Sequence, residues 1–238
     1  MTNCRLKISA GIIALAAGAI VFLTAAAPGK GAKLELEEAN IFWEYNSTDN
    51  DLGVHVFLDG EDWKKMTITN PLGHRLFDVK GQGLYKKLGM SELFFEGAEP
   101  VLGEELELEE LLAGFPEGEY EFEGKTAGGD TIEGEDDFTH AIPAGPKVVL
   151  EMSGSDFLRI SWSEVTAPPP GFPDRPIEIV AYQVLVDEVF DVIVPSSVLS
   201  VTVTPELVAA LENGEHEFEV LAIEESGNQS ITESSFMK

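Results

Sequence analysis

The side chains best suited to chemistry lie in two acidic segments, residues 46–53 and 59–62. Calcium takes about six to eight oxygen ligands from carboxylates, carbonyls and water, and both segments supply such groups. The candidate metal ligands are Asp49, Asp51, Asp59 and Asp62. The spacing departs from that of the best-known calcium loop, because counting from Asp49 puts Gly53 one position early and Gly60 in place of the closing glutamate. Solvated turns rich in Asp, Asn and Gly are therefore the alternative interpretation.

Trp63 follows the second acidic segment directly, and the run of Asp and Gly before it predicts a turn with an exposed indole ring. A flat aromatic face beside carboxylates can stack on a sugar ring, so Trp63 is the candidate ligand contact. The aromatic residues Trp43, Tyr45 and Phe57 lie in alternating runs and are interpreted as core. A calcium-assisted carbohydrate-binding module is the functional hypothesis that these residues support.

No catalytic motif accompanies these residues. The sequence has four histidines but no His-Glu-x-x-His helix, no Gly-x-Ser-x-Gly turn and no phosphate-binding glycine loop, and Cys4 is its only cysteine. We therefore expect a protein that is not an enzyme and needs no cofactor other than, on the hypothesis above, calcium. Glycoside hydrolysis needs only two carboxylates, so a carboxylate-dependent hydrolase fragment is kept as a weaker alternative.

The second half of the chain, residues 147–238, alternates apolar and polar residues as half-buried β-strands do. Trp162, the Tyr182 segment, and Leu211-x-x-Gly-x-His-x-Phe-x-Val-x-Ala leading into the turn at 225–228 resemble a fibronectin type III domain. The resemblance implies a β-sandwich. His216 stands where that family usually has a tyrosine, and we expect it to make the same hydrogen bond with some dependence on pH.

The first half, residues 33–143, resembles a more divergent immunoglobulin-like or fibronectin type III-like module. Residues 65–70 and 74–80 flank Asn70-Pro-Leu-Gly, which predicts a hairpin. Residues 104–110 alternate leucine and glutamate, which predicts an edge strand, and residues 81–103 are expected to hold a short helix and a flap that covers a sheet edge.

Residues 111–124 and 207–220 read as two copies of one segment, separated by about the length of one sandwich domain of roughly 100 residues. The fold class that follows is all-β, with two tandem immunoglobulin-like β-sandwich domains at 33–143 and 147–238. Residues 140–147, with two prolines, are expected to form a short stiff linker that limits relative domain motion.

Residues 8–27 carry no charge, follow Arg5 and Lys7, and end in three alanines, which is typical of a signal peptide. The stretch is also long enough to span a bilayer, so residues 1–27 are either a cleaved leader or an uncleaved membrane anchor. In both cases the remaining chain is exported to the periplasm, the cell surface or the medium.

The charge is strongly unbalanced, with 43 acidic against 15 basic residues and a net charge of −28. Such a surface repels phosphate backbones, so nucleic acid is not expected as a partner, and membrane contact is expected only through an uncleaved leader. The sequence thus favours an exported, non-catalytic tandem sandwich that contacts protein or polysaccharide at the cell surface in adhesion or assembly.

Overall fold

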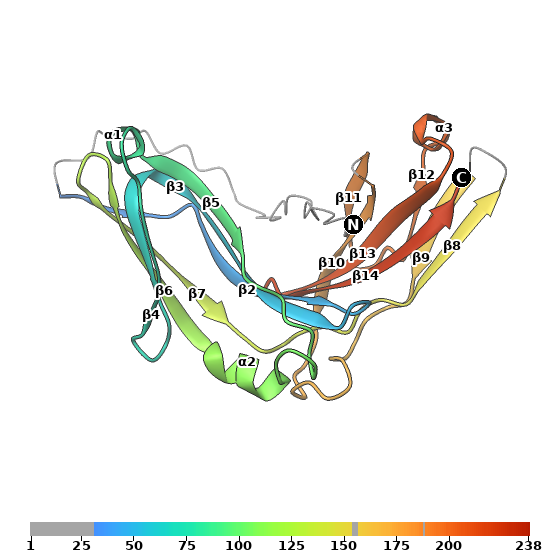
Figure 1. Cartoon of the computed structure of the whole chain (residues 1–238), viewed down its shortest axis with the longest axis horizontal. Helices are drawn as coiled ribbons and strands as arrows, with labels where there is room; N and C mark the ends of the chain where they lie inside the picture. The colour runs from blue at the N-terminus through green and yellow to red at the C-terminus, as the bar shows by residue number, and fades with distance from the viewer. Residues whose placement is uncertain (1–30, 154–156, 188) are drawn as a thin grey trace, which may run out of the picture.

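Residues 31–153, 157–187 and 189–238 are described by the structure, a computed structural model, and most of them lie in β-strands. Figure 1 shows the strands as two curved arms that meet near β2 and β14. The leader expected over residues 1–27 lies outside the described residues. Within the described ranges, none of the helices is long and apolar enough to cross a membrane.

The second arm is an immunoglobulin-like β-sandwich. One sheet of three strands has the order β12-β9-β8, with β8 (Val148–Ser153), β9 (Phe157–Trp162) and β12 (Ser200–Val203). The facing strands are β10 (Ile179–Val186), β11 (Phe190–Pro195), β13 (Glu215–Glu224) and β14 (Gln229–Met237). Trp162 and Tyr182 face each other across the core with ring centroids 5.4 Å apart, and the Tyr182 hydroxyl accepts the Val165 N–H at 3.0 Å. The alternating pattern therefore correctly indicated the inward face.

The first arm contains seven strands and, besides helix α2 described below, a short helix. They are β1 (Lys33–Glu35), β2 (Glu38–Asn46), β3 (Asp51–Thr69), β4 (Arg75–Lys80), α1 (Tyr85–Leu88), β5 (Met90–Glu96), β6 (Gly118–Thr126) and β7 (Thr131–Phe138). The expected hairpin is confirmed, because β3 pairs with β4 and the Asn70 side chain accepts the N–H groups of Leu72 and His74 at 3.1 and 2.9 Å. The expected short helix is α1.

Strand β3 pairs with four other strands of the first arm. Its first half pairs with β2 and β5 up to Asp59, β5 pairs with it again at Trp63, and its second half pairs with β6 from Trp63 and with β4 from Lys65. The chain bends at Gly60, where an added Cβ would lie 3.0 Å from Leu36 and 3.2 Å from Ile132. The expected turn over residues 59–62 is therefore wrong: these residues form a corner inside one continuous strand, because both halves keep their apolar side chains in the same core.

The edge strand expected over residues 104–110 is also wrong. The chain turns there and then forms helix α2 (Leu108–Gly114). Leu111 and Leu112 are adjacent in sequence and both are buried, which a helix allows and a strand with alternating faces does not. Packing against the core therefore overrides the leucine–glutamate alternation before it.

The repeated segment has the same structure in both arms. Helix α2 leads into β6 as helix α3 (Pro205–Ala210) leads into β13. The Tyr120 hydroxyl donates to the Pro116 carbonyl at 3.1 Å, and His216 Nε2 bonds the Glu212 carbonyl at 2.8 Å. Both bonds span four residues, so the histidine takes the place of the tyrosine as expected.

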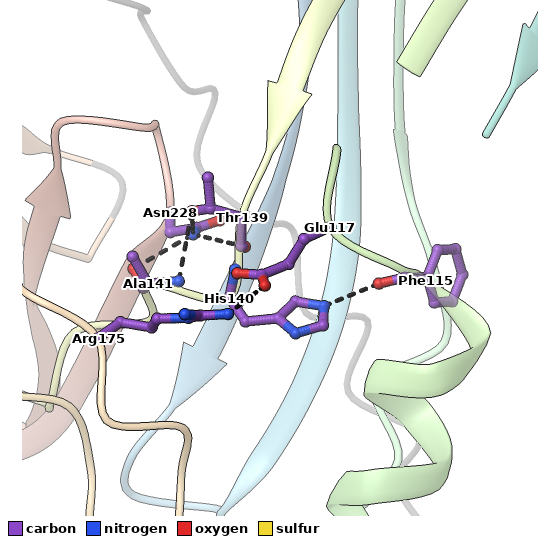
Figure 2. Close-up of polar contacts among 7 residues, drawn as sticks. All are labelled: Phe115, Glu117, Thr139, His140, Ala141, Arg175 and Asn228. Atoms are coloured by element: carbon purple, nitrogen blue, oxygen red, sulfur yellow. Dashed lines mark hydrogen bonds and ion pairs between the residues drawn. The ribbon is translucent and has the colours of Figure 1, made fainter. Parts of the chain in front are cut away.

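The two arms share one sheet. Strand β14 pairs in parallel with β2, which joins the arms into an eleven-stranded sheet with the order β1-β7-β6-β3-β2-β14-β13-β10-β11, and β4 and β5 are attached to β3. Figure 2 shows the hydrogen bonds beside this pairing. Asn228 Nδ2 donates to the carbonyls of Thr139 and Ala141 at 3.0 and 3.2 Å, and Arg175 pairs with Glu117. The backbone of the linker segment is therefore hydrogen-bonded to the second arm.

Candidate metal centre at the junction of the arms

The four aspartates predicted as metal ligands do not meet. Asp49 lies in the turn between β2 and β3, Asp51 begins β3, and Asp59 and Asp62 lie at its corner. At ~3.3 Å per residue, the strand separates Asp51 from Asp59 by roughly 26 Å. Among the described residues, one group of three or more side chains has metal-ligand spacing, and it contains none of the four. Calcium binding by single loops stays a prediction.

Trp63 is not exposed, contrary to the expectation. Its side chain is completely buried in the core of the first arm together with Met66 and Ile132. The reason is the corner, which directs the indole inward at the position where β3 starts to pair with β6. The proposed sugar-stacking surface therefore does not exist at this residue.

The group with metal-ligand spacing consists of Glu44, His55 and Glu99. In β2 the residues Ile41, Trp43 and Tyr45 fill the core, so Glu44 lies on the opposite face of the sheet. The register of β2 and β3 pairs Phe42 with His55, which puts the histidine on this same face. Two strands thus present a carboxylate and an imidazole side by side.

Glu99 reaches the group because the chain after β5 turns back over β3. The Gly97 N–H donates to the Val54 carbonyl at 2.9 Å, which holds the turn against the strand. Gly53 leaves the room that Glu99 occupies, since an added Cβ at Gly53 would lie 2.5 Å from the Glu99 Cγ. A glycine directly opposite Glu44 in the register therefore admits the third side chain.

The ligand atoms of the three residues lie within 4.8 Å of one another. His55 Nε2 is 3.0 Å from Glu99 Oε1, and His55 Nδ1 is 3.8 Å from Glu44 Oε2. The histidine is completely buried, and its Nδ1 has no hydrogen-bond partner. The rings of Phe42 and Phe94 lie 5.4 and 5.7 Å from the imidazole and exclude water from it. A buried polar atom without a partner is costly, and this atom points toward a carboxylate.

Interactions within the group offset only part of the free-energy cost of burying the charges of Glu44 and His55. Burial raises the pKa of Glu44 to about 7; the charge of His55 opposes this shift and the charge of Glu99 adds to it. Burial alone would lower the pKa of His55, but the hydrogen bond to Glu99 and the charge of Glu44 outweigh it, so the pKa is raised. The group therefore favours bound positive charge, whether a proton or a cation.

The second arm closes one side of the group. Gln229 of β14 donates through Nε2 to Glu44, and Asn46, two residues along β2, donates to Glu233 at 2.9 Å. Gln229 is paired with Glu44 in the β14–β2 register and is 1% exposed. The orientation of Glu44 therefore depends on both arms.

Sequence reasoning missed all three residues. Glu99 follows His55 by a hairpin and a helix, and Gln229 comes from the other arm, so no local spacing connects them. The available signal was a histidine and a glutamate on the outward face of adjacent alternating strands, with a glycine opposite the glutamate.

No family model matches the sequence, and no curated protein matches it. Solved structures with detectable likeness include the spore cortex lytic enzyme SleM of Clostridium perfringens, at 13% identity and a TM-score of 0.32. The match covers 40% of this chain and 28% of that enzyme, so the chain spans less than a third of its length.

A segment of two fibronectin type III domains from chicken tenascin is 10% identical, with a TM-score of 0.30 and coverage of 85% of this chain and 99% of that one. The BSP domain of a biofilm-associated protein is 12% identical, with a TM-score of 0.26 and coverage of 85% and 30%. These three TM-scores lie below 0.5, so the assignment to an immunoglobulin-like β-sandwich fold rests on the strand order and the two cores described above.

Proposed function

We propose that this chain is an exported, non-catalytic contact protein of the cell surface, acting in adhesion or assembly. The observation that carries the proposal is an exposed apolar loop, residues 81–89, which we call the tip and which holds α1 in Figure 1. Leu84, Tyr85 and Leu88 are 70%, 63% and 67% exposed, and α1 has no buried residue. Grouped exposed apolar side chains mark contact sites more often than scattered ones do.

Backbone contacts hold the tip against the corner of β3, although its side chains are exposed to solvent. Gly81 donates its N–H to the Lys64 carbonyl at 2.9 Å, and Gly89 donates to Tyr85 at the same distance. Gly89 has φ +82°, and an added Cβ would lie 2.6 Å from Asp62, so only glycine fits this close approach to the corner of β3. The expectation that this segment forms a flap covering a sheet edge is therefore wrong for the tip, because the apolar side chains of the tip face solvent.

Charge indicates the kind of partner. Lys80, Lys86 and Lys87 are exposed at or beside the tip of a chain whose net charge is −28. A surface that combines leucines with lysines suits a protein partner with an apolar pocket and an acidic rim. Polysaccharide, the other partner class expected from the sequence, offers little apolar surface to leucine.

The test uses the cells that produce the protein. The wild-type chain should be accessible to antibody and protease on intact cells, and Leu84→Ser with Leu88→Ser should reduce cell attachment several-fold without changing its amount. The control is Leu72→Ser, since Leu72 is 65% exposed in the β3–β4 turn, away from the tip. A chain found only inside cells, or attachment equal in all three strains, would refute the proposal. Attachment that is lost after glycan removal but not after protease treatment would assign the partner to polysaccharide.

A further inference from the structure

We propose that His55, through Nδ1, and Glu44 bind one divalent transition-metal ion of the zinc class at the junction of the arms, with Glu99 holding the imidazole through Nε2. This proposal concerns a different part of the molecule from the tip and does not depend on the contact function. It begins from the geometry: three ligand-type side chains from β2, β3 and the turn after β5, with ligand atoms within 4.8 Å of one another.

The unpartnered nitrogen is the second observation. His55 is 0% exposed, and its Nδ1 has no hydrogen-bond partner, while Nε2 lies 3.0 Å from a carboxylate oxygen. In metal sites one imidazole nitrogen binds the ion and the other is commonly hydrogen-bonded to a carboxylate or carbonyl group. An ion bound by Nδ1 and Glu44 would therefore satisfy an atom that the protein alone leaves unsatisfied, while Glu99 holds Nε2 in the way that such sites commonly do.

The donor set selects the class of metal. The Nδ1 of His55 and the carboxylate of Glu44 are nitrogen and oxygen ligands of the kinds that zinc takes, and water would complete the coordination. Imidazole suits zinc, copper, iron and nickel, whereas calcium and magnesium prefer sites made of oxygen atoms alone. Glu44 and Glu99 also place two carboxylates beside one buried imidazole, where a divalent cation would offset their repulsion.

The surroundings of these side chains indicate a preorganised binding site and not a chance cluster of exposed acidic residues. Phe42 and Phe94 enclose the imidazole, Gly53 makes room for Glu99, and Gln229 of the second arm orients Glu44 by a hydrogen bond. A bound ion would consequently link the turn after β5 to the β2–β3 hairpin and, through Gln229, would stabilise the pairing of β2 with β14. We expect metal binding to strengthen the junction between the arms.

The experiment uses the purified full chain, stripped with chelator and titrated with zinc by calorimetry in high salt, which screens weak binding to the acidic surface. We expect one zinc ion per chain, a rise of several degrees in the melting temperature, and a much weaker response to calcium and magnesium. Cobalt bound in place of zinc should give the visible absorption bands of a site with a low coordination number. The ¹⁵N NMR signals of the His55 ring nitrogens should shift when the metal binds.

Two variants test the site. Glu44→Gln and Glu99→Gln keep the side-chain shape and remove a charge, so the metal-free protein should still fold, while zinc affinity should fall by at least about 10-fold. The control is Glu92→Gln, an exposed glutamate of β5 on the same face of the sheet, which should leave zinc affinity unchanged. Stoichiometric zinc binding that survives both variants, no binding above the background of the acidic surface, or an equal preference for calcium would overturn the proposal.

Discussion

Asn228 should contribute more to the stability of the junction than any exposed residue around it. Its side chain is 1% exposed, accepts the buried backbone N–H of Trp43 at 2.8 Å, and donates to the carbonyls of Thr139 and Ala141. Replacement by alanine leaves this backbone N–H unpaired, at a cost of about 1–3 kcal/mol, and removes two further bonds worth about 1 kcal/mol each. We therefore expect Asn228→Ala to lower the free energy of unfolding by about 3–5 kcal/mol.

The assay is equilibrium unfolding of the full chain in urea, followed both by circular dichroism and by tryptophan fluorescence. The fluorescence sums Trp43 and Trp63 of the first arm and Trp162 of the second. In the wild type, circular dichroism and fluorescence should show one common transition because the arms share one sheet. In Asn228→Ala the two signals should no longer coincide, because the arms unfold at different urea concentrations when the junction is weakened.

Asn213→Ala is the matched control, because Asn213 is an exposed asparagine in the turn before β13. Its effect should stay within about 0.5 kcal/mol. If Asn228→Ala also costs less than about 1 kcal/mol and both signals still change together, the assignment of Asn228 as the main tie between the arms is wrong.

Three further predictions concern buried and titrating groups. Trp63→Ala should cost about 3–5 kcal/mol in urea denaturation because it empties a fully buried site, and a cost below about 1 kcal/mol would contradict that burial. The hydrogen bond to Asp187 raises the pKa of His216 above its ordinary 6.5, so the stabilisation from protonated His216 is present below pH 6.5 and is lost as pH rises through the folded pKa. His216→Tyr should therefore reduce the difference in urea midpoint between roughly pH 5 and pH 9. A difference equal to that of the wild type would refute this. Burial raises the pKa of Asp136 from 3.8 to about 6, so the folded protein loses stability as this carboxyl ionises. Asp136→Asn keeps an acceptor for the Ile41 backbone N–H and should be more stable than the wild type above pH 6. Equal stability of the two proteins above pH 6 would contradict the raised pKa.

The parts of the fold that could be predicted are those that local patterns determine. Alternation identified the inward faces of β2 and β10, and the repeated segment identified β6 and β13, which carry Tyr120 and His216, as equivalent strands of the two arms. The side chains of Tyr120 and His216 each form a hydrogen bond with a carbonyl only four residues away, so the information needed lies within one segment of the sequence.

The parts that could not be predicted depend on contacts between distant segments. Asp59, Gly60 and Asp62 have the composition of a turn, but pairing with β5 and β6 keeps them in one strand. Exposure of Trp63 was inferred from that turn and is wrong for the same reason. His55 and Glu99 meet only because Gly53 leaves room and β5 returns over β3, which no periodicity in the sequence reveals.

The pairing of β14 with β2 also has a consequence for the order of folding. Residues that bond across it, such as Glu44 and Gln229, lie 185 positions apart, so this contact has one of the largest loop-closure costs in the molecule. During synthesis or export from the amino end, β2 emerges long before β14, and its unpaired edge must stay available without joining the edge of another chain. We therefore expect the junction to form last, and aggregation to be greatest for chains that stop short of β14.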